Sequence, residues 1–255
     1  MKNIDKMLKD NNNNLTSPMD DMYELGMIPS CDFFEIEDED GVCGFFATNS
    51  ENVMLQFYVK DKNREDISMI FDSVITQNGV KKALCCSNDP IFYSLCERNS
   101  TNIVTNDYMF HENEVIINPM PFDGIVMDHA NINKLDEIMS YFTGIGMIGD
   151  WLVNYITQRI NQVELILFRY NGKIIGTGET RASISSEGYA NIGMTVSTDY
   201  RRLGLGSYII STIRKLTNER GYKAICSTDK TNIASIHTIS KSGFVCYHKV
   251  DEITF

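Results

Sequence analysis

Val196-Ser-Thr-Asp-Tyr-Arg-Arg-Leu-Gly-Leu-Gly-Ser207 joins a predicted β-strand to a predicted α-helix. Glycines 204 and 206 allow the backbone to approach a ligand closely, and the first N–H groups of a helix have no intrahelical partners. Together with the positive end of the helix dipole, these N–H groups favour phosphate oxygens. Ser207, Arg201 and Arg202 add a hydroxyl and charge-assisted donors. The stretch therefore predicts a phosphate-binding turn, and an ordinary tight turn is the alternative.

Two common nucleotide-binding motifs do not fit this turn. Ile209 occupies the position of the third glycine in a dinucleotide fingerprint, and no lysine follows as in a P-loop. Apolar periodicity and turn residues predict the elements around it. These are strands at 125–127, 163–170, 173–182, 189–196 and 223–227, helices at 131–141, 151–159, 206–220 and 232–241, and a final pair of strands at 244–247 and 250–255. A glycine-rich apolar loop, 143–150, is expected to be mobile and to line a substrate site.

The first half of the chain repeats this order of elements in outline. Strands are predicted at 32–36, 42–47, 53–59, 79–85 and 102–110, and helices at 67–77 and 90–97. Gly79-Val-Lys-Lys-Ala-Leu-Cys85 corresponds to Gly221-Tyr-Lys-Ala-Ile-Cys226 with one residue inserted. The repetition predicts an internal duplication, with chance resemblance between two α/β units as the alternative. Asn118-Pro-Met-Pro-Phe-Asp-Gly124 has the composition of a linker, so we expect domains at 1–118 and 119–255.

Composition is that of a protein with a packed core: 43% of the 255 residues are apolar and 22% are charged, so neither metal nor disulfides are needed to hold it. Residues 1–118 carry 9 Lys or Arg against 21 Asp or Glu, a net charge of −12, whereas residues 119–255 carry +1. An acidic face repels nucleic acid and anionic membranes and weakly favours a cationic partner or substrate. The alternative is a solvated surface that maintains solubility.

The cysteines and the N-terminus indicate a reducing, cytoplasmic setting. Seven cysteines form no CxxC pair, an odd number cannot be fully paired within one chain, and most lie in apolar runs where a thiol behaves as a small hydrophobic residue. The N-terminus leads into the polar run 11–14 and contains no apolar stretch typical of a signal peptide. No window approaches the length of a transmembrane helix.

Residues 124–255 resemble the GNAT superfamily of N-acetyltransferases, and most closely in style its two-domain and FR47-like members. The valine-ended strand followed by Arg-Arg-Leu-Gly-Leu-Gly206 is similar to the signature Arg/Gln-x-x-Gly-x-Gly/Ala. Asn232-Ile-Ala-Ser235, on a helix that ends at Gly243-Phe244, is similar to the second motif. The resemblance implies an α/β fold with a mostly antiparallel mixed sheet flanked by helices, here duplicated with a degenerate N-terminal copy.

The resemblance also implies acetyl-CoA as cosubstrate. In the family the signature strand diverges from its neighbour, so that its main chain binds the pantetheine arm, while the turn binds the pyrophosphate and the asparagine helix flanks the thiol end. The residues carried over are Met194, Thr195, Val196, Arg201, Arg202, Leu203, Gly204, Leu205, Gly206, Ser207, Asn232 and Ser235. A helix N-cap is an equally good interpretation of Asn232, and core packing is the alternative for Met194 and Val196.

Transfer of an acetyl group to an amine requires a base, because an ammonium with a pKa near 10.4 is neutral about once in 10³ at pH 7. Glu179, on the strand beside the signature strand, is the best carboxylate for this role, with a solvent-facing strand residue as the alternative. Asp150 is a weaker candidate. Many family members protonate the departing thiolate with a tyrosine seven residues after the asparagine, where this chain has Ile239. Water can serve, since a thiol pKa is near 8.5.

The first half lacks the cofactor motif. Its corresponding stretch, Lys60-Asp-Lys-Asn-Arg-Glu-Asp-Ile67, contains no glycine and several carboxylates, so we expect a non-catalytic copy that supports the second domain and walls the acceptor cleft. The sequence favours an N-acetyltransferase that acts on a small primary amine. A non-enzymatic acyl-CoA-binding sensor or interaction protein is the second hypothesis, and another nucleotide-binding α/β protein is the third. The sequence permits a homodimer and identifies no particular acceptor.

Overall fold

The structure is a computed structural model that describes residues 2–114 and 122–255. The first half contains α1 (Lys2–Asn13), β1 (Asp32–Asp38), β2 (Gly41–Thr48), β3 (Val53–Val59), α2 (Ile67–Gln77), β4 (Lys82–Cys86), α3 (Pro90–Arg98) and β5 (Asn102–Glu112). The second half contains β6 (Ile125–His129), α4 (Leu135–Gly144), α5 (Asp150–Asn161), β7 (Leu165–Tyr170), β8 (Lys173–Ala182), β9 (Tyr189–Val196), α6 (Leu205–Glu219), β10 (Lys223–Asp229), α7 (Ile233–Lys241) and β11 (Phe244–Thr254).

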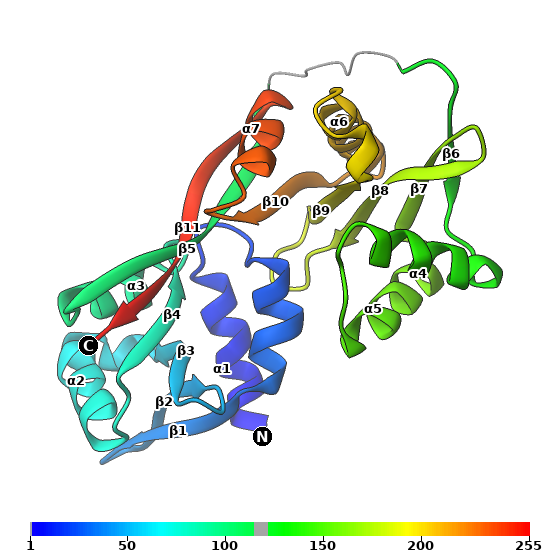
Figure 1. The fold of residues 1–255 in the computed structure, drawn as a ribbon. Helices are drawn as coiled ribbons and strands as arrows, with labels where there is room; N and C mark the ends of the chain where they lie inside the picture. Colours follow the sequence, from blue (N-terminus) through cyan, green and yellow to red (C-terminus); the bar gives the residue numbers. More distant parts are fainter. Residues whose placement is uncertain (1, 115–121) are drawn as a thin grey trace.

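All described strands belong to one mixed sheet with the order β1-β2-β3-β4-β11-β5-β10-β9-β8-β7-β6 (Figure 1). β3 and β4 pair in parallel, as do β9 and β10, and the other described neighbours are antiparallel. Helices flank the sheet. The predicted fold class, a mostly antiparallel mixed sheet with helices in two similar halves, is confirmed.

The two halves exchange their last strands. β5 lies beside β10, with Phe110 opposite Cys226, and β11 lies beside β4, with Val250 opposite Cys86. β5 and β11 also pair with each other along most of their lengths and cross the middle of the molecule in Figure 1. Each half therefore completes its sheet with a strand from the other half.

The predicted pair of strands at 244–247 and 250–255 is wrong, because the chain forms the single strand β11 there. Its register against β5 shifts between Cys246 and His248 and again between Val250 and Asp251. Such irregularities let a strand bend while it stays in the ladder. The apparent break in the sequence pattern therefore marks a bulged strand rather than a turn.

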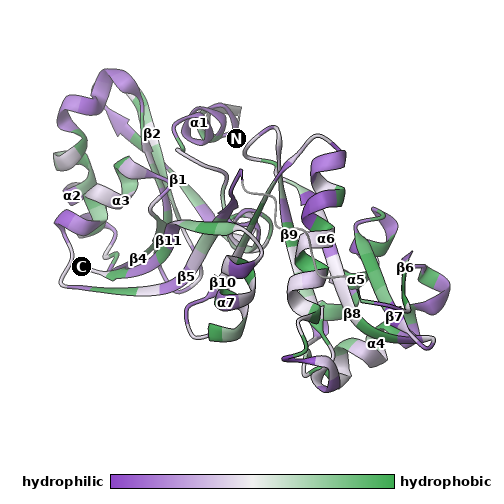
Figure 2. Cartoon of the chain, turned by 90° about the horizontal axis from the view of Figure 1, so that it is seen from above, coloured by the Kyte–Doolittle hydropathy of each residue, from purple (hydrophilic) through white to green (hydrophobic). Residues whose placement is uncertain are grey.

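The exchanged strands carry core residues. Ile253 of β11 is fully buried among Phe71, Phe92 and other residues of the first half, and the ring of Phe255 lies 5.8 Å from that of Phe71. Phe110 of β5 is buried with Ile213 of α6 in the core of the second half. Figure 2 shows hydrophobic segments along the strands of both halves. Each core thus depends on an apolar side chain that the other half supplies.

The helix α1 was not anticipated from the sequence. Met7 is buried against Phe45 and Tyr58, with Ile4 and Leu8 packed beside it. The spacing of these three apolar residues is helical, but the asparagine-rich surroundings obscured it. The predicted linker falls mostly on residues 115–121, outside the described residues, so the expected boundary between residues 118 and 119 stays a prediction.

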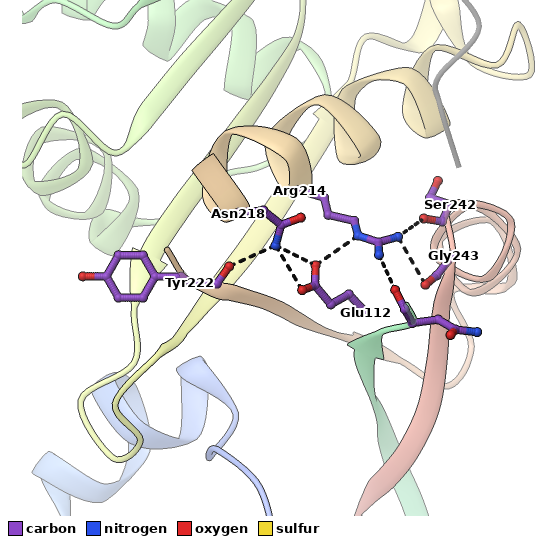
Figure 3. Close-up of polar contacts among 7 residues, drawn as sticks. Glu112, Arg214, Asn218, Tyr222, Ser242 and Gly243 are labelled. Atoms are coloured by element: carbon purple, nitrogen blue, oxygen red, sulfur yellow. Dashed lines mark hydrogen bonds and ion pairs between the residues drawn. The ribbon is translucent and has the colours of Figure 1, made fainter. Parts of the chain in front are cut away.

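A buried ion pair fastens β5 to α6 (Figure 3). The guanidinium of Arg214 donates from Nε to Glu112 Oε2 at 3.0 Å, and donates further to the carbonyl oxygens of Ser242 and Gly243 at the start of β11. Asn218 donates to the same carboxylate at 3.0 Å. The side chains of Arg214 and Glu112 are only 8% and 15% exposed. This cluster joins both exchanged strands to the helix that carries the predicted phosphate-binding turn.

Substitution Glu112→Ala should lower the stability of the protein by about 3 kcal/mol, because it leaves the charge of Arg214 buried without its main partner. The measurement is the urea midpoint followed by far-UV circular dichroism. Glu114→Ala, which removes an exposed carboxylate two residues away, should leave the midpoint unchanged. Equal midpoints for Glu112→Ala and wild type would show that the pair does not hold the exchanged strands.

Candidate active site and its comparison with known proteins

β9 and β10 diverge after three paired positions. Their ladder joins residues 189–191 of β9 to residues 223–225 of β10. Beyond Asn191, β9 continues to Val196 beside β8, and β10 continues to Asp229 beside β5. The predicted residues Met194, Thr195 and Val196 therefore lie where β9 has no described partner on its β10 side. An extended ligand can bind such an open strand edge as an added strand does.

The predicted phosphate-binding turn lies directly after this open edge. Gly204 and Arg202 have φ angles of +85° and +64°, a left-handed conformation that is unusual for arginine. The turn ends as Leu205 begins α6, and Arg201 Nε donates to the carbonyl of Val196 at 3.3 Å. A Cβ on Gly206 would lie 3.2 Å from Thr238 and 3.3 Å from Met194. The glycine thus permits close packing of α6 against β9 and α7.

The second motif forms the start of α7. Asn232 is the helix N-cap, and its side chain accepts a hydrogen bond from the backbone N–H of Ser235 at 3.2 Å. The N-cap interpretation is confirmed, and the contact of both residues with the thiol end of a cofactor stays a prediction. Ile239, at the position where a tyrosine was sought, is buried in the core of the second half.

A cavity of about 560 Å³ opens on the sheet face that α4 and α5 cover, next to the divergence of β9 and β10. Its floor is formed by β8 and β9, with cross-strand pairs at Thr177 and Thr195, Glu179 and Gly193, and Arg181 and Asn191. Side chains from α5 form one wall, and residues of the first half form another. The lining residues from the first half are Asp21, Met22, Leu25, Gly26 and Met27.

Glu179, the predicted base, lies in this cavity rather than in open solvent. Its side chain is 20% exposed, and Oε2 accepts a hydrogen bond from the hydroxyl of Tyr155 at 2.8 Å. The carboxylate lies across Gly193, since a Cβ there would be 2.5 Å from Oε1. Asp150, the weaker candidate, is exposed at the start of α5 and is not among the cavity-lining residues. Met147 brings the glycine-rich loop to the cavity, and the expectation that this loop lines a substrate site stays a prediction.

Sequence reasoning missed the groups that surround Glu179. Tyr155 projects from α5, and burial raises the pKa of its hydroxyl. Asp21 comes from the first half and forms an ion pair with Arg181, whose Nη2 also lies 3.8 Å from Glu179 Oε1. Burial raises the pKa of Asp21 to about 6, although Arg181 opposes the shift. The spacing of residues along α5 could have shown that Tyr155 lies on the helix face that lines the cavity. No local sequence pattern indicates that Asp21 lies there.

Cys226, on β10, also lines the cavity. Burial raises the pKa of its thiol well above the ordinary range. The thiolate is the nucleophilic form of cysteine, so this environment disfavours a covalent acyl-cysteine step. All seven cysteines lie in the described part of the chain and have free thiols.

Residues 16–27, which we call the bridging segment, attach the first half to the cavity. Asp20 accepts from the hydroxyl of Ser227 on β10, and the carboxylate of Glu24 accepts from the backbone N–H of Ile184 at 3.1 Å. On the other side, Asn88 donates to the carbonyl oxygens of Ser17 and Pro18 at 3.0 and 3.1 Å. The segment is therefore hydrogen-bonded to both halves.

Tyr23 of the bridging segment occupies the first-half counterpart of the strand divergence. β3 and β4 pair only at residues 53–54 and 82–83 within the described chain and then diverge as β9 and β10 do. The Tyr23 hydroxyl lies between them, donating to the carbonyl of Leu55 at 3.0 Å and contacting that of Leu84. The side chain is buried with Met19, Leu55 and Val250. The chain's own tyrosine thus satisfies strand-edge carbonyls in this half.

Comparison with known families finds acetyltransferases in both halves. The model described as "Acetyltransferase (GNAT) domain" matches residues 1–113, and that described as "Acetyltransferase (GNAT) family" matches residues 135–244. None of the curated proteins matches the sequence. Fold and site together define an acyltransferase class. The chain belongs to the GNAT acetyltransferases and contains two GNAT domains, as the sequence resemblance implied.

Solved structures show the same fold. A GNAT-family acetyltransferase from Colwellia psychrerythraea superposes with a TM-score of 0.91 at 24% identity, covering 100% of this chain and 96% of the other. A tandem GNAT protein from the clavulanic acid biosynthesis pathway superposes with a TM-score of 0.61 at 10% identity. The match covers 99% of this chain and 95% of the other. A GCN5-related N-acetyltransferase from Sphaerobacter thermophilus superposes with a TM-score of 0.57 at 12% identity. The match covers 86% of this chain and 79% of the other. In the described residues of this chain, no helix combines the length and hydropathy that crossing a bilayer requires.

Substitution Tyr23→Phe should destabilise the protein by about 1 to 3 kcal/mol, because the buried carbonyl oxygen of Leu55 loses its donor. Thermal and urea unfolding both measure this loss. Tyr247→Phe is the matched control, since Tyr247 is 63% exposed, and it should unfold as wild type does. If Tyr23→Phe were equally stable, the hydroxyl would not be needed to close the divergence of β3 and β4.

Proposed function

We propose that the second domain is an acetyl-CoA-dependent N-acetyltransferase that acts on a primary amine, and that the first domain is a degenerate copy without a cofactor site. One contrast carries this proposal. The divergence of β9 and β10 has an open strand edge, a glycine-containing turn and a cavity with a carboxylate. The divergence of β3 and β4 is filled by Tyr23.

We place acetyl-CoA on the open side, along the residues that the sequence resemblance implies. The pyrophosphate is placed at the turn from Arg201 to Ser207, where the first N–H groups of α6 and two arginines supply donors. The pantetheine arm is placed along the open edge of β9 at Met194, Thr195 and Val196. Asn232 and Ser235, at the start of α7, are placed near the thiol end. The packing of Met194 and Thr238 around Gly206 supports this arrangement, since it brings the three elements together.

The cavity supports attack by an amine. Glu179 accepts the proton of the incoming ammonium directly or through a water, and the free amine then attacks the thioester carbonyl. The C–N bond forms, the C–S bond breaks, and the second proton of the amine nitrogen passes through water to the departing thiolate. Tyr155 is a positioning residue, because its hydroxyl donates to Glu179 and thereby orients the carboxylate. With Ile239 at the usual tyrosine position, this chain relies on the modest basicity of the thiolate.

The first domain offers no comparable turn. Residues 61–66 form a short helical turn without glycine, in which Arg64 pairs with Asp61 at 2.8 Å. Its arginine therefore pairs with a carboxylate of the same turn, and two more exposed carboxylates, Glu65 and Asp66, lie in the same stretch. We assign this domain to support of the second one and to one wall of the acceptor cavity. Seven free thiols support a reducing, cytoplasmic location.

Substitution Gly206→Glu should abolish the stabilisation of the protein by acetyl-CoA, because it places bulk and negative charge at the phosphate-binding turn. For the wild type, acetyl-CoA at about 100 times its dissociation constant should add roughly 2.7 kcal/mol of stability. Thermal-shift assays measure the stabilisation by acetyl-CoA in the wild type and in Gly206→Glu. Gly206→Gln has the same bulk without the charge and should retain part of the shift. A full shift in Gly206→Glu would show that the cofactor binds elsewhere.

Substitution Glu179→Gln should lower kcat by about 10² to 10⁴ with little change in acetyl-CoA binding, because it removes the base but keeps a partner for Tyr155. Release of free thiol from acetyl-CoA across a panel of amines measures the rate, and Glu187→Gln on an exposed turn is the control. An unchanged kcat would eliminate Glu179 as the base. Tight acetyl-CoA binding without turnover of any amine would instead select the acyl-CoA sensor.

A further inference from the structure

The cavity over the strands β8 and β9 has an apolar wall. Apolar side chains line it from the bridging segment, from α4 and α5, and from the loop between these helices. They include Met22, Leu25, Phe142, Met147 and Trp151. A wall of this composition favours a ligand with an apolar body, and the few polar groups of such a cavity then decide which ligand binds.

The charged side chains that line the cavity balance one another. Within the described chain they are two carboxylates, Asp21 and Glu179, and two guanidinium groups, Arg159 and Arg181. Arg181 pairs with Asp21, and its Nη2 lies 3.8 Å from Glu179 Oε1. Arg159 Nη1 lies 3.0 Å from Glu164 Oε2, so each guanidinium already faces a carboxylate. A ligand group without charge preserves this balance, because an added charge would be buried without a partner.

Three residues that line the cavity have buried donors without a partner. Nδ2 of Asn191, Nε of Arg159 and Nε of Arg181 make no hydrogen bond among the described residues. Asn191 and Arg159 are each only 5% exposed. The two guanidinium groups lie over the same ring, that of Tyr155, with Cζ 5.4 and 5.5 Å from its centroid. An unpaired donor at such depth is costly unless a ligand or water satisfies it, so these donors indicate a ligand that accepts hydrogen bonds.

Strand geometry places the side chain of Asn191 on the face of the sheet that the cavity covers. Asn191 lies opposite Arg181 in the ladder of β8 and β9, as Gly193 lies opposite Glu179. Side chains two residues apart on a strand share a face, and Asn191, Gly193 and Thr195 all line the cavity. Asn191 and Arg181 therefore stand side by side on the floor of the cavity.

An uncharged carbonyl group meets these conditions. Its oxygen has two lone pairs and brings no proton, so it can accept from two donors at once. An ammonium offers only donors, and a hydroxyl brings a donor together with its lone pairs. A carboxylate accepts, but both guanidinium groups already face carboxylates. Of these four groups, only the carbonyl accepts hydrogen bonds without adding a charge or a further donor.

We propose that the floor of this cavity is a subsite for an uncharged carbonyl group on the body of the ligand, and that Asn191 is the residue that selects it. The carbonyl oxygen accepts from Nδ2 of Asn191 and faces the guanidinium of Arg181, while the apolar part of the ligand packs on Phe142, Met147 and Trp151. The inference rests on the proposed acetyltransferase function and deepens it, because it names a group that the acceptor carries beside its amine.

Calorimetric titration of the full chain with three amines tests the subsite without requiring turnover. L-Phenylalaninamide, 2-phenylethylamine and L-phenylalanine share the amine and the phenyl body and differ only in an added carboxamide, hydrogen or carboxylate. The wild type should bind L-phenylalaninamide about tenfold more tightly than either of the others, because one hydrogen bond to a buried donor is worth about that factor. Equal or weaker binding of the amide would overturn the proposal.

Substitution Asn191→Leu should remove this preference. It should lower the affinity for L-phenylalaninamide about tenfold and leave that for 2-phenylethylamine unchanged. Comparing two ligands on two proteins cancels the difference in basicity between the amines. Asn191→Ala, which adds no bulk, should give the same loss, and Asn154→Leu, at an exposed position of α5, should bind both ligands as wild type does. A preference that survives in both Asn191 variants would contradict the assignment.

Stability distinguishes a ligand-binding role of Asn191 from a structural one. Because its Nδ2 is buried without a partner among the described residues, Asn191→Leu should not lower the urea midpoint of the free protein. L-Phenylalaninamide should raise the midpoint of the wild type more than that of the variant, since it binds the wild type more tightly. A lower midpoint in Asn191→Leu with the ligand preference intact would assign the side chain to the fold instead.

Release of free thiol from acetyl-CoA separates this inference from the function on which it rests. A lower KM for L-phenylalaninamide than for 2-phenylethylamine, lost in Asn191→Leu with kcat retained, supports both. Preferred binding of the amide without acetyl transfer supports the subsite and contradicts the acetyltransferase. Transfer to both amines with equal KM supports the enzyme and contradicts the subsite.

Discussion

The pairing of β5 with β10 and of β11 with β4 is the constraint on which the rest of the structure depends. A strand edge must satisfy its backbone N–H and C=O groups, and here each half does so with a strand from the other half. Ile253 and Phe110 carry the same exchange into the two cores. Neither half is complete alone, so a wall from the first domain can stand at a fixed position over the floor of the second. A cavity built across two independently moving domains would lack that precision.

The two parallel strand pairs show how one backbone geometry can serve two purposes. Divergence of β3 from β4 exposes carbonyl groups just as divergence of β9 from β10 does. In the first domain the exposed carbonyls meet the hydroxyl of Tyr23, together with a buried apolar cluster. In the second domain the edge leads to a turn in which Arg202 and Gly204 adopt left-handed conformations. Backbone strain of that kind persists where the surroundings enforce it, often at ligand sites. The difference between the two domains therefore lies in what fills the gap.

Much of the local structure follows from the sequence, because strands and helices leave periodic signals and the turns between them leave residue signals. The strand from 53 to 59 and the helix from 67 to 77 agree with β3 and α2 in both limits. The glycine turn and the N-cap Asn232 could also be predicted, since their local geometry depends on neighbouring residues only. The exchange of β5 and β11 leaves no such signal, because periodicity shows which face of a strand is buried but not which strand lies beside it. The bulges in β11 likewise imitate a turn.

Asp21 shows why part of the candidate site lay beyond the reach of the sequence. It stands in an acidic half whose net charge is −12, and most carboxylates there are solvated. Its importance comes from 8% exposure beside Arg181, 160 residues along the chain, and from the anchoring of its segment by Tyr23 and Asn88. Burial changes the role of this carboxylate, because its charge loses contact with water and is then stabilised mainly by the ion pair with Arg181. The first half thus supplies part of the wall of a cavity whose floor belongs to the second half, although the divergence of its own strands is filled by Tyr23.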